Sequence, residues 1–513
     1  MEYLMGIDLG STSLKAMIYG LDGTVIASGS RPTKKYHPST EHPEWAVWQP
    51  EQIWGDTAAA VRDAVAALDD PRHIKAVAVT GMGMDGLPID QDGAWLYPMI
   101  SWHDPRTAEQ HRWWQEHITA EKVFSIGGNP LWPINSALRI LWMKQHEPEI
   151  MKRADKWLLI EDFLNFMLCG ERATDYSMAS CTLLFDQRTL DWSSEMLDAA
   201  GIDRELMCDV HPSGTVIGEV TAAAADKTGL SAGTPVVLGG HDHLCGGLPV
   251  GAFRPGVVLD VVGTWEIVTT VTDRPILKPE LCTAGMTVQA HVARGMHAIW
   301  GSDVSAGMLE WFREQFGVHA GHQAEIGTTS DWDQLMQIAS AAPAGAQNVM
   351  FLPHMSGTLC PIVDDRSLGA FVGLGSRATF GDMLRAVIEG LNFQFLDIVR
   401  AMESSLDSEL KKFIAVGGVT RNDFWMQNKA DILGCDVEVP DIQEATPLGA
   451  AILAGIGVGL FESEQDAFEK IYRPGRVYRP DPELTADYAR RFDVFRQIYP
   501  ALKQLNVQLH ELP

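Results

Sequence analysis

The pattern that most constrains the fold is a strand, a turn of glycine and hydroxyl residues, and a second strand, which occurs twice along the chain. The first copy spans residues 4–19 around the turn at 10–13, and the second spans 257–271 around the turn at 263–264. Two unrelated domains would rarely share this opening. We therefore predict a duplicated chain, divided near residue 248, whose two domains pack around a central cleft.

Length and charge narrow the classes of function. The chain has 513 residues, far above the ~150 of a typical domain, with 46% apolar and 21% charged residues, so compact folding is expected. Its formal charge of -27 repels phosphate backbones and anionic headgroups. We expect no nucleic-acid or membrane partner, and sixteen Trp leave room for a homodimer interface.

The cysteines, the first residues and the longest apolar run all favour a location in the cytoplasm. Seven cysteines form no Cys-x-x-Cys pair, which favours reduced thiols and excludes a zinc ribbon. The first residues lack the basic region of a signal peptide. The longest apolar run, 447–461, is shorter than the ~18 residues of a membrane span and begins with Pro447, so we expect a buried helix there.

Periodicity predicts a mixed α/β chain. Apolar runs predict strands, and three- or four-residue spacing predicts helices. The predicted strands are 24–28, 74–80 and 235–238, and the predicted helices are 53–67, 107–117, 135–144, 161–168 and 484 to about 505.

The first turn is a candidate phosphate site. Ser11, Thr12 and Ser13 bring backbone N–H groups and three hydroxyls to one point, which suits phosphate oxygens. Asp8 could hold a magnesium ion through water, and Lys15 could add a positive charge. The alternative is an ordinary hairpin turn, but the second copy at Gly263 and Thr264 favours the functional interpretation.

The second candidate is the loop after strand 235–238. Asp242 lies where this strand ends, and phosphoryl transfer needs a carboxylate that accepts the proton of the attacking hydroxyl. Its neighbours His241 and His243 form a His-x-His pair that could instead ligate zinc. A structural loop with solvated histidines is favoured over zinc, because no further ligand cluster accompanies the pair.

The third candidate follows the strand that ends at Gly417 and Gly418. Paired glycines let a flat ring approach the backbone, and Asn422 can donate and accept hydrogen bonds, which fits an adenine slot; a simple tight turn is the alternative. Residues 81–86 match G-x-G-x-x-G, but residues 87–93 indicate a strand and a turn. A dinucleotide site is therefore not expected.

The order and spacing of these segments resemble the FGGY family of carbohydrate kinases, within the actin-like ATPase superfamily. The resemblance spans nearly the whole chain and implies an α/β fold with two ribonuclease-H-like domains. Residues 1–248 would bind the sugar and supply the base, and residues 249–513 would bind ATP. The segments that carry it are 8–13, 100–107, 173–177, 240–242, 263–264, 385–391 and 448–451.

The resemblance also implies a role for each matching residue, with ATP and Mg²⁺ as cofactors. Asp242 is similar to the family's general base, and Asp8 to its magnesium-side acid. The implied phosphate contacts are Ser11, Thr12, Ser13, Lys15 and Thr264; the implied nucleoside pocket contains Gly307, Gly417, Gly418 and Asn422; the implied sugar site contains Met84 and Asp85, with His243 beside the base.

The sugar site departs from better-known members of the family. Xylulokinases usually show Met-His-Gly where this chain has Met84, Asp85 and Gly86, and glycerol kinases show Arg-Glu nearby. A carboxylate can accept two sugar hydroxyls, which favours a neutral polyhydroxylated substrate. We expect a pentulose such as xylulose, with a tetritol or other short polyol as the alternative. A chaperone-like actin-family ATPase and a degenerate sugar sensor are the rival classes.

Overall fold

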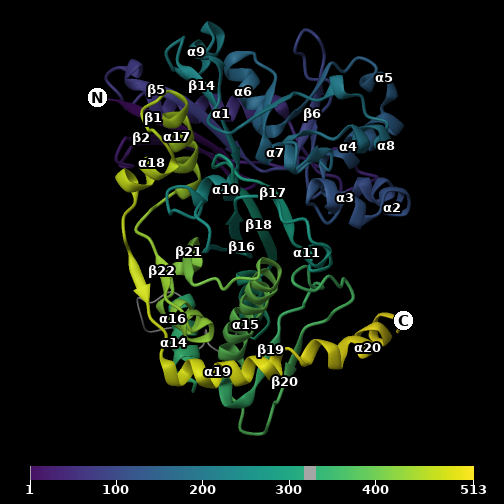
Figure 1. The fold of residues 1–513 in the computed structure, drawn as a ribbon, viewed down its shortest axis with the longest axis vertical. Helices are drawn as coiled ribbons and strands as arrows, with labels where there is room; N and C mark the ends of the chain where they lie inside the picture. The colour runs from purple at the N-terminus through teal and green to yellow at the C-terminus, as the bar shows by residue number, and fades with distance from the viewer. Residues whose placement is uncertain (1, 317–330, 513) are drawn as a thin grey trace.

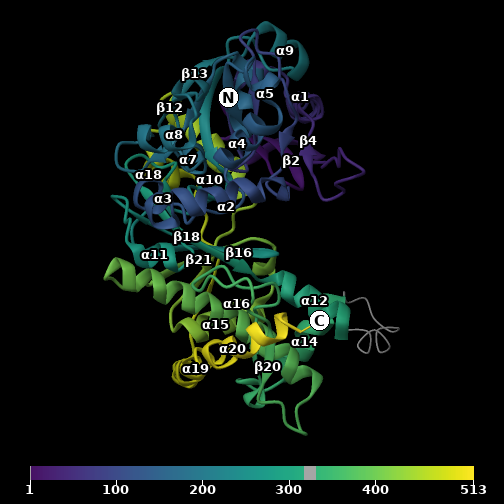
Figure 2. The ribbon, with the colours of Figure 1, turned by 90° about the vertical axis from the view of Figure 1, so that its right-hand side faces the viewer.

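The structure, a computed structural model, describes residues 2–316 and 331–512. Two lobes are stacked along the long axis, with the N-terminus in the upper lobe and the C-terminus in the lower one (Figure 1). The view turned by 90° keeps the same division, with blue N-terminal elements above and green elements below (Figure 2). Each lobe contains one large mixed sheet.

The sheet of the upper lobe has the order β13-β14-β5-β1-β2-β3. Strands β14, β5 and β1 run parallel, whereas β13, β2 and β3 are antiparallel to their neighbours. The central strand β5 is an apolar run that is buried almost throughout, as expected for a parallel strand covered on both faces. The bounds are β1 (Tyr3–Leu9), β2 (Ser13–Gly20), β3 (Val25–Pro32), β5 (Ile74–Gly81), β13 (Val216–Glu219) and β14 (Pro235–His241).

The sheet of the lower lobe repeats this plan, with the order β17-β18-β16-β15-β21-β22-β23. Strands β15, β21 and β22 are parallel, and β16, β18 and β23 are antiparallel to their neighbours. The predicted two-domain fold is thus confirmed. The bounds are β15 (Val257–Val262), β16 (Trp265–Thr272), β17 (Thr287–Ala290), β18 (His297–Val304), β21 (Lys412–Val416), β22 (Val437–Val439) and β23 (Arg476–Tyr478).

Helix α17 (Ala445–Gly457) comes from the second half of the sequence but packs on the sheet of the upper lobe, where it lies beside β1 and β5 (Figure 1). A β-carbon at Gly6 of β1 would stand 1.8 Å from the Pro447 carbonyl oxygen, so helix and strand touch through their backbones. The helix is apolar on every side, and residues 447–455 are buried, which confirms the predicted buried helix.

The other predicted helices form with shifted ends, except that the predicted tail helix is divided in two at Arg496 and Gln497. Pro500 causes the break, because its ring clashes with the carbonyl four residues earlier. The predicted helices are α1 (Pro50–Val65), α2 (Ala108–His117), α4 (Ser136–His146) and α6 (Ile160–Cys169), and the tail forms α19 (Pro482–Phe495) and α20 (Ile498–His510). Three further helices are α15 (Phe380–Leu406), α16 (Asp423–Leu433) and α18 (Glu464–Ile471).

Shorter elements complete the two lobes. Within the described ranges, no helix combines the length and the apolarity that crossing a membrane requires. The remaining described helices are α3 (Ala120–Gly127), α5 (Pro148–Met151), α7 (Tyr176–Ser180), α8 (Ser194–Ala200), α9 (Ala222–Thr228), α10 (Asp242–Gly247), α11 (Pro279–Thr283), α12 (Ala306–Phe316) and α14 (Asp331–Ala341). The short strands are β4 (Val47–Trp48), β6 (Gly86–Ile89), β7 (Met99–Ile100), β8 (Lys156–Leu159), β9 (Ala173–Asp175), β10 (Phe185–Asp186), β11 (Asp191–Trp192), β12 (Asp209–His211), β19 (Met350–Leu352) and β20 (Ala370–Val372).

Candidate active site

Three candidate segments meet at one edge of the upper sheet. Leu9 of β1 pairs with Gly81 of β5, and Gly81 pairs with His241 of β14, so the carboxyl ends of these parallel strands lie in one row. Asp8, the loop at 82–85 and Asp242 therefore share the edge where open α/β sheets bind their ligands. The loop continues into strand β6, as predicted, so residues 81–86 lead into no helix.

Asp242 is the first residue of α10, and its side chain is 34% exposed. The backbone N–H of His243 donates to its carboxylate over 2.6 Å, and the imidazoles of His241 and His243 each lie 3.7 Å from Oδ1. Burial raises the pKa of Asp242, but the interactions with His243 and His241 outweigh burial and leave that pKa below its ordinary value. Asp242 is therefore an accessible, ionised carboxylate at neutral pH.

Asp8 is half-buried at the end of β1, in register with Lys15 of β2. Burial and the nearby charge of Asp242 raise the pKa of Asp8 to about 8. Lys15 lowers this pKa, but its ammonium is bound by Glu444 at 2.6 Å, at the start of α17. The charge of Asp242 acts on Asp8, and the carboxylate oxygens of both residues are ligands that suit a divalent cation such as Mg²⁺. Ser11 and Ser13 are half-buried and Thr12 is exposed on the adjoining turn.

Met84 and Asp85 of the predicted sugar site lie in the loop between β5 and β6. Asp85 is fully buried, with one carboxylate oxygen accepting from Trp48 Nε1 at 2.6 Å and the other 3.8 Å from Arg139. Burial raises the pKa of Asp85 to about 6, although Arg139 and Trp48 lower it. No described residue hydrogen-bonds to its Oδ1, so this buried oxygen keeps an acceptor free. Met84 is buried, and its carbonyl accepts from the hydroxyl of Ser136.

In the lower lobe, the predicted nucleotide segments converge on the second turn. Gly417 has a φ of 108°, and a β-carbon there would stand 2.3 Å from the carbonyl oxygen of Val262, so its backbone touches the end of β15. The carbonyl of Thr264 accepts from the backbone N–H of Gly307 at 3.2 Å, which ties the turn to the start of α12. Only glycine accommodates this contact and this φ at position 417.

A cavity of about 1260 Å³ opens beside this turn, lined by Thr264, Gly307, Gly418 and Asn422 of the predicted residues. Gly417 contacts the carbonyl of Val262 just before the turn and is not part of the cavity lining. Of the described residues, the lining includes none from the turn at 10–13, which belongs to the upper lobe. The cavity is large enough for a nucleotide.

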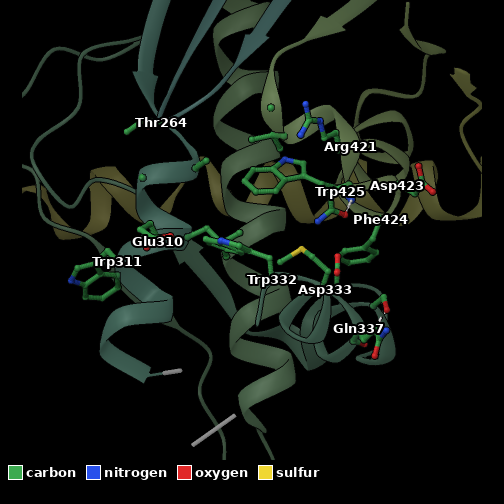
Figure 3. Close-up of a pocket in the computed structure, with 18 of the residues that line it drawn as sticks. Thr264, Glu310, Trp311, Trp332, Asp333, Gln337, Arg421, Asp423, Phe424 and Trp425 are labelled. Atoms are coloured by element: carbon green, nitrogen blue, oxygen red, sulfur yellow. Dashed lines mark hydrogen bonds between the residues drawn. The ribbon is translucent and has the colours of Figure 1, made fainter. Parts of the chain in front are cut away.

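Aromatic side chains form much of the cavity wall. Trp425 and Arg421 lie across from Trp311 and Glu310, and Trp332 lies between them in the view of Figure 3. The sequence assigned no role to these residues, because the tryptophans come from three separate segments and share no spacing. Flat aromatic walls suit the stacking of a base. Asn422 has a structural task as well, since its Oδ1 accepts from the Trp425 backbone N–H at 3.1 Å and caps α16.

The duplicated lobes, the carboxylate at the edge of one sheet and the nucleotide-sized cavity beside the matching turn of the other are together typical of a two-lobed, nucleotide-dependent kinase of the actin-like superfamily. Comparison with known families agrees. Residues 3–248 match the N-terminal domain of the FGGY family of carbohydrate kinases, and residues 259–458 match its C-terminal domain. The chain belongs to this family and is an ATP-dependent carbohydrate kinase, as the sequence predicted.

Individual relatives are similar over nearly their whole length. The chain is 28% identical to a xylulose kinase of Staphylococcus epidermidis, covering 99% of this chain and 98% of the relative. It is 30% identical to the L-fuculokinase of Escherichia coli, covering 94% and 98%. The crystal structure of a xylulose kinase from Rhodospirillum rubrum superposes with a TM-score of 0.90 at 28% identity, covering 98% and 100%.

Proposed function

We propose that the chain transfers the γ-phosphoryl group of ATP to a primary hydroxyl of a small neutral ketose, with a pentulose such as xylulose as the first candidate substrate. The similar xylulose kinases support this choice. A tetritol or other short polyol is the second candidate, favoured by Asp85, whose Oδ1 receives no hydrogen bond from the described residues and could accept a hydroxyl. Membership of the carbohydrate kinase family argues against a chaperone-like ATPase.

The accessible carboxylate of Asp242 carries the proposed mechanism. Asp242 accepts the proton of the attacking hydroxyl, the hydroxyl oxygen forms a bond to the γ-phosphorus, and the bond to the ADP oxygen breaks. Its lowered pKa keeps it ionised and able to orient the hydroxyl. Met84, Asp85 and His243 would hold the sugar, with Asp85 receiving a hydroxyl on Oδ1.

The nucleotide would occupy the cavity of the lower lobe, with its nucleoside against Gly307, Gly418 and Asn422 and its phosphates toward Thr264. Ser11, Thr12, Ser13 and Lys15 would contact the terminal phosphate from the upper lobe. Asp8 would hold Mg²⁺, which neutralises charge on the phosphates when bound. We place the functional boundary near residue 248, with 1–248 binding the sugar, 249–513 binding ATP, and α17 completing the upper lobe.

The test measures ADP release with ketoses and short polyols for the wild type and for Asp242→Asn, which keeps the shape of the side chain but removes the base. We expect sugar-dependent turnover in the wild type, and ATP binding without turnover in Asp242→Asn. The matched control is Asp226→Asn, on an exposed position of α9, which should behave as wild type. Substantial turnover by Asp242→Asn would refute the assignment of the base. Turnover that is independent of any sugar would instead refute the sugar substrate.

A further inference from the structure

His241 precedes the proposed base and receives contacts from both lobes. It is buried at the end of β14, where its Nδ1 lies 3.2 Å from Nε2 of Gln289, on β17 of the lower sheet. The thiol of Cys181, from the upper lobe, lies 3.5 Å from the same nitrogen. Burial raises the pKa of this thiol and keeps it protonated. Burial also lowers the pKa of His241 to about 3, so the imidazole is neutral and carries one proton.

Trp300 decides which nitrogen of His241 carries that proton. The indole N–H of Trp300, on β18, lies 2.7 Å from Oε1 of Gln289, and an indole N–H can only donate. The oxygen of Gln289 therefore faces Trp300, and its NH₂ group faces His241. Because the NH₂ group is a donor, Nδ1 of His241 must accept, and the proton is on Nε2. That nitrogen lies 3.7 Å from Oδ1 of Asp242.

We infer that Trp300 and Gln289 fix the tautomer of His241 so that a proton, and not a lone pair, is on the nitrogen that lies 3.7 Å from the carboxylate of Asp242. Gln289 and His241 are then positioning residues for the base, an inference that rests on the proposed role of Asp242. The chain of contacts crosses between the lobes, since β17 and β18 belong to the lower sheet. The edge of the nucleotide-binding lobe thereby orients the group that deprotonates the sugar.

The same tautomer argues against a metal ion at this position. Ligand atoms of His241, Asp242 and His243 lie within 4.8 Å of one another, a spacing that could hold zinc. Coordination through Nε2 of His241 requires a lone pair on that nitrogen. The hydrogen bond that Gln289 donates to Nδ1 instead leaves the imidazole proton on Nε2. Removing the contact should release the constraint and create a zinc site.

The experiment replaces Gln289 by methionine, which keeps the length of the side chain but removes the donor. We expect kcat to fall about tenfold, because the other tautomer of His241 would place a lone pair instead of a proton on the nitrogen nearest the ionised carboxylate of Asp242, with the KM for ATP unchanged. Equilibrium dialysis with Zn²⁺ alone should show one ion bound by Gln289→Met and none by the wild type. The matched control is Gln187→Met, at an equally buried glutamine that does not contact His241, which should change neither quantity.

Two further measurements separate this inference from the role of the base. Nitrogen chemical shifts of His241 in the wild type report the tautomer without any turnover, and we expect the proton on Nε2. His241→Gln, which keeps an N–H donor near that position, should retain more turnover than His241→Met. A proton on Nδ1, or a Gln289→Met variant that matches Gln187→Met in kcat and zinc binding, would overturn the inference. Turnover retained by Asp242→Asn would show instead that the assigned base itself is wrong.

Discussion

At the scale of single residues, two carboxylates near the same sheet edge differ because their surroundings differ. Asp242 is partly exposed and lies beside two imidazoles and a backbone N–H, so its pKa is lowered. Asp85 is fully buried, and one hydrogen bond from Trp48 and the more distant Arg139 do not compensate, so its pKa is raised. Desolvation therefore determines the direction of the pKa shift of Asp85, and the neighbouring imidazoles and N–H group determine that of Asp242.

The raised pKa of Asp85 predicts a dependence of stability on pH. The carboxyl titrates near 3.8 in the unfolded chain and about 6 in the folded chain, so between these values the folded state binds more protons. The free energy of unfolding should therefore fall as pH rises from 4 to 7, by about 2 kcal/mol relative to Asp85→Asn. Urea unfolding of both proteins without sugar, at several pH values, measures this difference. A difference that stays constant with pH would contradict the prediction.

At the scale of elements, the cavity of the lower lobe depends on backbone contact between β15 and the loop that precedes α16. Gly417 makes that contact with the carbonyl of Val262, at a positive φ, whereas a β-carbon on Gly418 would meet open space. The two neighbouring glycines therefore have different tasks. Gly417 fixes the distance between the loop and the turn at 263–264, and Gly418 leaves the cavity open.

Replacing these glycines by alanine should separate the two tasks. Gly417→Ala should lower the free energy of unfolding by about 1–3 kcal/mol, because it combines a clash with a strained φ, and it should weaken ADP binding as the turn shifts. Gly418→Ala should leave stability nearly unchanged. Thermal unfolding and calorimetric titration with ADP measure both effects. Equal stability of the two variants would mean that the loop adapts freely.

The secondary-structure elements were more predictable than the tertiary contacts between them. Strand alternation and the repeated turn predicted β1, β2, β15 and β16 from local patterns alone, and apolarity predicted the buried helix α17. The lobe that α17 joins could not be predicted, because an apolar helix fits either sheet. The contacts of Trp48 and Arg139 with Asp85 were missed for a related reason, since they join residues far apart in sequence and follow no spacing.

At the scale of the whole molecule, α17 links the two lobes by completing the upper one. Its start also carries Glu444, which binds Lys15 of β2, so packing and charge both tie the second half of the chain to the first. The close approach at Gly6 shows how tightly the helix is seated. Stability of the upper lobe should therefore depend on a segment that follows most of the lower lobe in the sequence.

Gly6→Ala should destabilise the full chain, because the new methyl group would meet the carbonyl of Pro447 and lift α17 from the sheet. We expect a loss of about 1–3 kcal/mol in the free energy of unfolding. Gly55→Ala, on an exposed position inside α1 with open space around it, should instead stabilise the chain by about 0.5–1 kcal/mol. Opposite shifts of the melting temperature test the pair. Shifts of the same sign would refute the proposed importance of the α17 contact.

The late position of α17 has a consequence for synthesis on the ribosome. When the last strand of the upper sheet has left the exit tunnel, the apolar face that α17 covers is still bare, and it remains so while the lower lobe is translated. The nascent chain must therefore carry an unfinished lobe while residues 242–444 are added. Such an intermediate would be prone to aggregation until residues 445–457 emerge, and ribosome-associated chaperones could bind its bare apolar face.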